Sequence, residues 1–455
     1  MMRFDLATAA RITGGRIIGP DATFEGAAID SRRVRPGQLF CALPGDRVDG
    51  HAFVAAAAAA GASAALVARE VDAPIARLVV DDVTEALGRL AAAWRESLDV
   101  TVVGITGSNG KTTVKNLVAG VLGRVAPTLA TEGNLNNELG VPLTLARLGA
   151  EHRFAVIEMG CGQPGDIEYL ARLARPTVGI VTNAGPAHLE RLGSVEGVAR
   201  CKGELFETVG ALRGAAGTVV INRDDPFCEA WIERAGQARI LTFGRDAAAD
   251  IQLIDDDGAP RLDTPQGIIE LHLALPGAHN RANAAAAAAA ALALDVPRER
   301  IEAGLASVHG VPGRLEVRHM KSGWTLIDDT YNANPASLYA AMAVLAEQPG
   351  ERWLVLGDMA ELGEDSDKLH AEVGSAAAEF GVSRLYATGL HANRAAVAFG
   401  TGGEAFASTE ELAEALNDAV HEGVVCLVKG SRSAHMEDVI ERLIDRRAAG
   451  EGETC

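Results

Sequence analysis

Short apolar runs that end in glycine, asparagine or aspartate recur through the middle of the chain, with helical spacing between them. The runs are DVTVVGITG at 99–107, FAVIEMG at 154–160, TVGIVTNAG at 177–185 and GTVVINRDD at 217–225. Alternation of such strands with helices is typical of parallel pairing. The pattern predicts a parallel β-sheet with helices on both faces.

The two ends of the chain repeat this pattern. Strands are predicted at QLFCAL (38–43) and RLVVDD (77–82) near the N-terminus, and at WTLIDD (324–329), ERWLVLGDM (351–359), SRLYATG (383–389) and VVCLVKGS (424–431) near the C-terminus. A chain of 455 residues also suits about three domains. We therefore expect an α/β protein with a small N-terminal domain (1–98), a central domain (99–314) and a C-terminal Rossmann-like domain (315–455).

Two alanine-rich runs could be mistaken for membrane spans. They are AFVAAAAAAGASAALVA, from residue 52, and ANAAAAAAAALAL, from residue 282. Alanine forms helices well but is only weakly hydrophobic. We expect helices buried against a sheet and no contact with a membrane.

Composition and charge exclude some classes of protein. Hydrophobic residues make up 48% and charged residues 23%, which is typical of a globular chain. A net charge of −19 would repel a polyphosphate backbone, so we expect no nucleic-acid partner. Six cysteines form no C-x-x-C pair, and no basic-then-apolar leader opens the chain. We expect reduced thiols and a cytoplasmic location.

The string GITGSNGKTT (104–113) departs from the usual phosphate-loop pattern, because Ile105 stands where the first glycine belongs. The chemistry needs only a flexible turn, backbone N–H groups, a lysine and a hydroxyl. Gly107 and Gly110 can provide the turn, Lys111 can neutralise phosphate charge and Thr112 can reach Mg²⁺. A glycine-rich turn that binds nothing is the alternative.

TGSNGKTT resembles the loop of the Mur ligases and their folylpolyglutamate synthetase relatives, and later motifs follow in the same order over essentially the whole chain. The resemblance implies an ATP-dependent, amide-forming enzyme with ATP and Mg²⁺ as cofactors. It assigns ATP binding to Gly107, Ser108, Asn109, Gly110, Lys111, Thr112 and Thr113.

Metal ligands are expected at the ends of the central strands. Glu158 ends FAVIEMG, where a carboxylate can hold Mg²⁺, as Thr112 can; a solvated glutamate is the alternative. By resemblance, His188 lies near a second Mg²⁺ and shares an N-x-x-x-x-H motif with Asn183. Lys202, in ARCKGELF, reads as an exposed helical lysine. The resemblance instead implies a carbamylated Lys202, an anionic metal ligand.

Two further motifs are expected to contact the nucleotide. GAHNRANA places Asn280 and Asn283 on one helical face, and the resemblance implies that they bind ATP; a helix N-cap is the alternative. PGRLE supplies Arg314, whose guanidinium could grip the γ-phosphate and an acyl phosphate. A solvated arginine is the alternative. Lys111, Lys202, His188 and Arg314 form the expected catalytic set.

The C-terminal domain carries two motifs. In IDDTYNANPAS, the resemblance implies that Asp329 contacts the ATP ribose and that Tyr331, Asn332 and Asn334 lie in the cleft; an Asx-rich turn is the alternative. KGSRSAHMEDVI, from residue 429, resembles the C-terminal loop of the family, and the resemblance implies that a second set of residues faces the site. A capped strand-to-helix turn is the alternative. That second set is Lys429, Ser431 and Arg432.

Substrate contacts are expected nearer the N-terminus. DSRRVRPGQLFCALPGDRVDGHAF, from residue 30, resembles a UDP-recognising domain, with Ser31 and Arg32 as candidates. TEGNLNNELGVPLTL, from residue 131, resembles the loop that meets the UDP-muramoyl end of the substrate, although a mobile surface loop is possible. Its candidates are Thr131, Asn134, Asn136, Asn137 and Glu138.

IDDTYNANPAS and GDMAELGEDS (357–366) resemble motifs of one branch of the Mur ligases. This resemblance implies the small-molecule substrates UDP-N-acetylmuramoyl-tripeptide and D-alanyl-D-alanine, and we expect a monomeric enzyme. Asn332 and Asn334 are assigned to substrate binding. A ligase for the third amino acid is an alternative, but its D-N-P-R string is absent from the sequence. A folylpolyglutamate synthetase and a nucleotide-binding regulator without ligase activity are two others.

Overall fold

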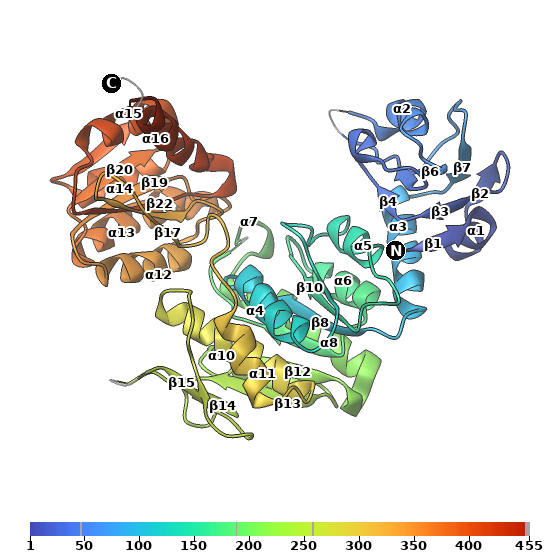
Figure 1. Cartoon of the computed structure of the whole chain (residues 1–455), viewed down its shortest axis with the longest axis horizontal. Coiled ribbons are helices and arrows are strands. Elements are labelled where there is room, and N and C mark those ends of the chain that lie inside the picture. The colour runs from blue at the N-terminus through green and yellow to red at the C-terminus, as the bar shows by residue number, and fades with distance from the viewer. Residues whose placement is uncertain (46–47, 188, 257–258, 451–455) are drawn as a thin grey trace.

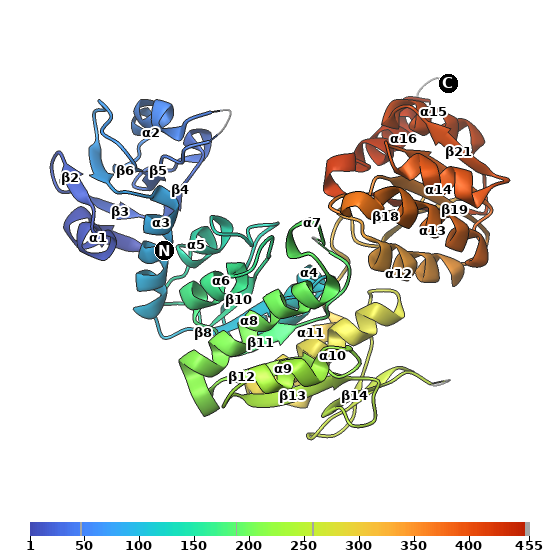
Figure 2. The same ribbon diagram turned by 180° about the vertical axis from the view of Figure 1, so that it is seen from behind.

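Three α/β bodies follow one another along the chain (Figure 1). The computed structural model describes residues 1–45, 48–187, 189–256 and 259–450, with side chains through residue 444. The N-terminal and C-terminal bodies lie at opposite ends of the central body, and both rise on the same side of it (Figure 2). The α/β class is confirmed. The boundaries at 98/99 and 314/315 stay predictions; they fall between α3 and β8 and between α11 and β17.

The N-terminal body is built around a small mixed sheet. In its described part, the strand order is β2-β7-β6-β5-β4, and β1 pairs separately with β3. The strands are β1 (Arg3–Asp5), β2 (Arg16–Ile18), β3 (Thr23–Glu25), β4 (Ala27–Ala28), β5 (Leu39–Cys41), β6 (Ala64–Val67) and β7 (Ala76–Val79). The helices are α1 (Leu6–Thr13), α2 (Val54–Ala59) and α3 (Val83–Glu96).

The first alanine-rich run differs from its prediction. Its helix, α2, is short, and of its residues only Val54 and Ala57 are buried. The run then continues into the buried strand β6. Alanine has too little apolar surface to determine burial by itself, so the surrounding fold decides which of these methyl groups are covered.

The central body contains a nine-stranded sheet, counted over the described residues, in the order β16-β15-β14-β13-β12-β11-β8-β10-β9. Pairing is parallel from β9 through β14 and antiparallel from β14 to β16, so the predicted parallel sheet has an unpredicted antiparallel edge. The strands are β8 (Thr101–Thr106), β9 (Thr128–Ala130), β10 (Phe154–Glu158), β11 (Val178–Val181), β12 (Thr218–Asn222), β13 (Arg239–Gly244), β14 (Ile251–Ile254), β15 (Arg261–Asp263) and β16 (Ile269–Glu270).

Helices cover both faces of this sheet, as predicted. The set is α4 (Lys111–Gly123), α5 (Gly140–Leu145), α6 (Asp166–Ala174), α7 (Leu189–Leu192), α8 (Val195–Arg213), α9 (Cys228–Arg234), α10 (Ala278–Ala293) and α11 (Arg298–Ala306). The second alanine-rich run forms α10, and its eight alanines 284–291 are fully buried in the core that α4 shares. Across the described chain, no helix has both the length and the apolar character that a bilayer crossing requires.

The C-terminal body repeats the plan with the strand order β17-β18-β22-β19-β20-β21 among described residues. Only the edge pair β17–β18 is antiparallel in that sheet. The strands are β17 (Glu316–His319), β18 (Thr325–Asp329), β19 (Glu351–Gly357), β20 (Arg384–Thr388), β21 (Gly403–Phe406) and β22 (Val424–Lys429). The helices are α12 (Pro335–Ala346), α13 (Ser366–Glu379), α14 (Ala392–Phe399), α15 (Thr409–Ala419) and α16 (Glu437–Gly450).

Candidate active site

A cavity of about 1390 Å³ lies where the carboxyl ends of β8, β10 and β11 face loops of the C-terminal body. Ligands of open α/β sheets usually bind at such strand ends. The cavity is lined by most of the predicted site residues: Ser108, Asn109, Gly110, Lys111, Thr112, Thr113, Asn134, Asn136, Asn137, Glu138, Glu158, Lys202, Asn280, Asn283, Arg314, Asp329, Asn332 and Asn334.

The glycine loop joins β8 to the first turn of α4. Gly110 has φ 80° and precedes the helix, and a Cβ there would lie 2.4 Å from Oδ1 of Asn283. A Cβ on Gly107 would lie 1.8 Å from Oγ1 of Thr182. The end of β11 braces the turn, because Asn109 N–H donates to Oδ1 of Asn183 at 3.0 Å. The loop therefore requires glycine at both positions and is held open at a helix N-terminus, which favours anions.

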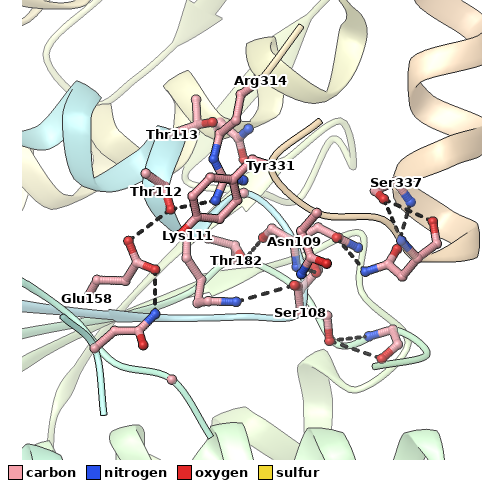
Figure 3. Close-up of a pocket in the computed structure, with 18 of the residues that line it drawn as sticks. Ser108, Asn109, Lys111, Thr112, Thr113, Glu158, Thr182, Arg314, Tyr331 and Ser337 are labelled. Atoms are coloured by element: carbon pink, nitrogen blue, oxygen red, sulfur yellow. Dashed lines mark hydrogen bonds between the residues drawn. The ribbon is translucent and has the colours of Figure 1, made fainter. Parts of the chain in front are cut away.

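Lys111 reaches back over the loop (Figure 3). Its ammonium donates to the carbonyl of Gly107 at 2.8 Å and to that of Ser108 at 3.4 Å. Burial lowers the pKa of Lys111 to about 8. A phosphate oxygen entering the loop would give this ammonium a charged partner in place of two neutral ones.

Thr112, Glu158 and Arg314 form a hydrogen-bonded chain (Figure 3). The Thr112 hydroxyl donates to Oε2 of Glu158 at 3.0 Å and accepts from Nη2 of Arg314 at 3.0 Å. Glu158 is buried, so the alternative of a solvated glutamate is wrong. The solvated-arginine alternative is also wrong, because the Arg314 guanidinium stacks 4.1 Å from the ring centroid of Tyr331 and its Nε is buried.

This chemistry fits Mg²⁺. Among the described residues, no cluster of three or more His, Cys, Asp or Glu side chains could hold a metal by itself. Magnesium does not need such a cluster, since it is usually held by one or two carboxylates, water and substrate phosphates. The paired oxygens of Thr112 and Glu158, next to the glycine loop, provide that kind of partial site.

Lys202 is not the exposed lysine that its sequence context predicted. It is 2% exposed on α8, and its Nζ lies 3.5 Å from Sγ of Cys161. α8 packs against the sheet, so the position is inside the protein rather than on its outer face. His188 lies outside the described residues, and its predicted role stays a prediction.

Asn280 and Asn283 lie in the first turns of α10. Gly277 is the N-cap residue, so the alternative of an asparagine cap is wrong. Asn280 donates to the carbonyl of Pro276 at 2.7 Å and accepts from Asn283 at 3.1 Å. Both asparagines are buried at the cavity wall. Asn283 also lies against Gly110 and so connects α10 to the glycine loop.

The C-terminal body contributes an ion pair and an inter-domain hydrogen bond. Asp329 pairs with Lys429 at 2.5 Å, and Lys429 also donates to the carbonyl of Asn332 at 2.9 Å. Asn334 caps α12 through a capping box with Ser337. The alternative of an Asx-rich turn therefore holds for this residue. Its amide also donates to Oδ1 of Asn109 at 2.9 Å, across the domain boundary.

The remaining motif residues divide between the cavity and its surroundings. Lys429 and Arg432 line it, whereas Gly107, Thr131 and Ser431 are absent from its described wall. Ser31 and Arg32 lie in a short 3₁₀ turn of the N-terminal body, where Arg32 pairs with Asp30. The structure does not bring these two to the central cavity. The loop 131–138 contacts Glu158 through Asn136, whose Nδ2 donates at 2.9 Å.

No motif in the sequence pointed to several other residues that lie at the cavity. Arg191, Tyr169 and His279 line it, and burial lowers the pKa of His279 to about 4, which keeps its imidazole neutral. Lys115 lies behind the wall, one turn after Lys111. The K-x-x-x-K spacing on one helical face was a signal that could have identified it.

Known proteins resemble the chain over its full length. Sequence profiles match for the Mur ligase family catalytic domain (23–95), the Mur ligase middle domain (105–291) and the Mur ligase glutamate ligase domain (313–432). The UDP-N-acetylmuramoyl-tripeptide–D-alanyl-D-alanine ligase of Escherichia coli K12 is 40% identical, with 100% of both chains covered.

Two solved structures show the same architecture. A crystal structure of MurF from Acinetobacter baumannii superposes with a TM-score of 0.88 at 37% identity, covering 96% of this chain and 98% of that one. The MurF ligase from Thermotoga maritima in complex with ADP gives 0.81 at 30% identity, covering 93% and 98%. The resemblance first seen in the motifs is thereby confirmed: the chain belongs to the Mur ligase family.

Proposed function

We propose that this protein joins D-alanyl-D-alanine to UDP-N-acetylmuramoyl-tripeptide at the expense of ATP, and so makes UDP-N-acetylmuramoyl-pentapeptide for peptidoglycan synthesis. The observation that carries the proposal is the full-length, 40% identity to the Escherichia coli enzyme of that name. The glycine loop and the chain Thr112–Glu158–Arg314 supply the phosphoryl-transfer part of such a site.

ATP binds with its phosphates in the turn Gly107–Gly110. Lys111 moves its ammonium from the loop carbonyls to the β- and γ-phosphates, and Arg314 approaches the γ-phosphate from the domain boundary. Asn280 and Asn283 face the nucleotide from α10. The solved relative with bound ADP supports nucleotide binding by this architecture.

Thr112 and Glu158 would hold Mg²⁺, which would neutralise phosphate charge when bound. We assign Lys202 to the same region as a carbamate, together with His188. The support for the carbamate is physical: Lys202 is buried at the cavity wall, where an ammonium would repel a cation and a carbamate would attract it.

The chemistry proceeds in two transfers. The terminal carboxylate of the tripeptide attacks the γ-phosphorus, the bond from phosphorus to the ADP oxygen breaks, and an acyl phosphate and ADP form. The amine of D-alanyl-D-alanine then attacks the acyl carbon, the bond to phosphate breaks, and the amine loses a proton. Lys111 and Arg314 stabilise the charge that develops on the transferred group, so the protein acts mainly by positioning and electrostatics.

The C-terminal body completes the site. Asp329 lies on β18 and Lys111 on α4, so nucleotide contacts from both require a defined relation between the two domains. Asn332 and Asn334 present amides to the same cavity, where they contact the substrate. The UDP end extends toward the loop 131–138 and to Ser31 and Arg32. The enzyme acts as a monomer in the cytoplasm, where ATP is available.

Phosphate release tests the function directly. With ATP, Mg²⁺ and UDP-N-acetylmuramoyl-tripeptide, sustained release should require D-alanyl-D-alanine. Mass spectrometry should show one pentapeptide product for each phosphate. Release that depends instead on a single amino acid with a UDP-dipeptide, or on glutamate with a folate, would assign the chain to another ligase of the superfamily. Nucleotide binding without any amine-dependent release would indicate a regulator.

A further inference from the structure

Lys115 is a buried lysine to which no role has been assigned so far. It lies on α4, one turn beyond Lys111. Its Nζ donates to the carbonyl of Thr131 at 2.8 Å and lies 3.9 Å from Oε2 of Glu158. A single ammonium therefore bridges the carboxylate at the end of β10 and the first residue of the loop 131–138.

That loop is tied to Glu158 at two more points. The backbone N–H of Glu158 donates to Oγ1 of Thr131 at 3.0 Å, and Nδ2 of Asn136 donates to Oε1 of Glu158 at 2.9 Å. Oε2 of Glu158 receives the Thr112 hydroxyl from the nucleotide side. Glu158 is thus the junction between the glycine loop and the loop 131–138, and Lys115 supplies the only positive charge among the described side chains that hydrogen-bond to this loop's backbone.

A structural role alone does not explain a lysine at this position. A buried ion pair loses hydration on both partners, and well-packed apolar residues often serve stability as well or better. A charged ammonium at this position has a use if its interactions change when a ligand binds. Cation binding at Glu158 would weaken the attraction between Glu158 and Lys115. The hydrogen bond to the Thr131 carbonyl would then be the main interaction of the Lys115 ammonium.

We infer that Lys115 is a positioning residue that couples the two halves of the site: Mg²⁺–nucleotide binding at Glu158 and UDP-sugar-peptide binding at the loop 131–138 strengthen each other through it. The inference rests on the proposed function for the identity of the two ligands. Coupling of this kind is reciprocal, so either ligand should report it.

The test is calorimetric and needs no turnover. The dissociation constant of UDP-N-acetylmuramoyl-tripeptide is measured for the full chain with and without a saturating, non-hydrolysable ATP analogue and Mg²⁺. For the native chain we expect binding to tighten by about tenfold when the analogue is present, a coupling of ordinary size. Lys115→Met should reduce this ratio to about one, and Lys115→Arg, which keeps the charge and donors, should restore much of it.

Lys368→Met serves as a matched control, because Lys368 is an exposed lysine on α13 whose removal should leave the ratio unchanged. If Lys115→Met does not fold, Lys115→Gln replaces it; this variant keeps a donor for Thr131 without the charge, and the same loss is expected. An unchanged ratio in the folded Lys115 variant, or no coupling in the native chain, overturns the inference. Failure of the native chain to bind either ligand would instead overturn the proposed function.

Discussion

Asn334 of the C-terminal body donates a hydrogen bond of 2.9 Å to Asn109 of the glycine loop, 225 residues earlier in the chain. The same side chain caps α12 with its oxygen, which accepts from the backbone of Ser337. One amide therefore caps the start of a helix and links that helix to the glycine loop of the central body.

Asn334→Asp separates the two tasks of this amide. The carboxylate still caps α12 but cannot donate to Asn109, so thermal stability should be kept while turnover falls by about tenfold, the equivalent of one lost hydrogen bond. Asn334→Ala should lose both turnover and about 1 kcal/mol of stability, the usual cost of a cap. Thermal unfolding and kcat/KM for ATP measure the two effects. Equal stability losses in both variants would contradict the separation.

Lys111→Ala should prevent ADP formation without unfolding the protein. The side chain hydrogen-bonds only to loop carbonyls in the described structure, so little packing depends on it. Losing one preorganised charge at a transferring phosphoryl group costs on the order of 10²–10³ in kcat. ADP release and the circular dichroism spectrum are the measurements. Turnover within a few-fold of the native rate would remove Lys111 from the mechanism.

Nucleotide affinity should depend on pH through Lys111. Burial holds its pKa at about 8, below the ordinary value for lysine. Binding of an anion favours the ammonium, so affinity should be full below pH 8 and fall as the pH rises above it. Titration with an ATP analogue from pH 7 to 9.5 measures this. Lys111→Met should bind weakly at every pH, with this fall removed; a fall that persists in the variant would assign it to another group.

Tyr331 should act through Arg314. Its ring lies 4.1 Å from the guanidinium, a contact worth about 0.5–2 kcal/mol. Tyr331→Phe keeps the ring and should be nearly silent, whereas Tyr331→Leu should lower kcat with little change in KM for the dipeptide. The comparison of the two variants is the measurement. An equal loss in both would mean that the hydroxyl, and not the ring, matters.

Lys202→Ala should be nearly inactive and partly rescued by short carboxylates such as formate or acetate, because these restore an anionic oxygen at the Lys202 position of the cavity wall. Chloride at the same ionic strength is the control. ¹³C-labelled bicarbonate should give a carbamate resonance in the native chain that the variant lacks. A native chain without that resonance, or a variant with native activity, would remove the carbamate from the mechanism.

The strand–glycine–helix pattern was enough to predict the strands around the site. Short apolar runs that end in turn residues are typical of buried strands. All ten strands predicted from sequence occur, including β10 with Glu158 at its end. The antiparallel edge β14–β16 was missed, since its short strands carry mixed polar and apolar residues and lack a long apolar run.

Burial of individual charged residues was harder to predict. Lys202 and Lys115 have ordinary helical contexts, yet both are buried, because the helices around them pack on the sheet and cover them from other parts of the chain. Arg314 is only partly exposed, and its stacking partner Tyr331 follows it by 17 positions, after β17 and β18. Such pairings arise from tertiary contacts, and a linear pattern does not contain them.

The eight consecutive buried alanines of α10 let the helix pack closely against its neighbours, because each side chain is a single methyl group. Asn280 and Asn283 stand at one end of that helix, and its flank lies against α4, which begins at Lys111. The spacing between these two helices is therefore set by the core rather than by surface residues. One added methylene at any of these alanines would overpack that core, so a library of variants should tolerate fewer substitutions here than at the polar residues of the cavity.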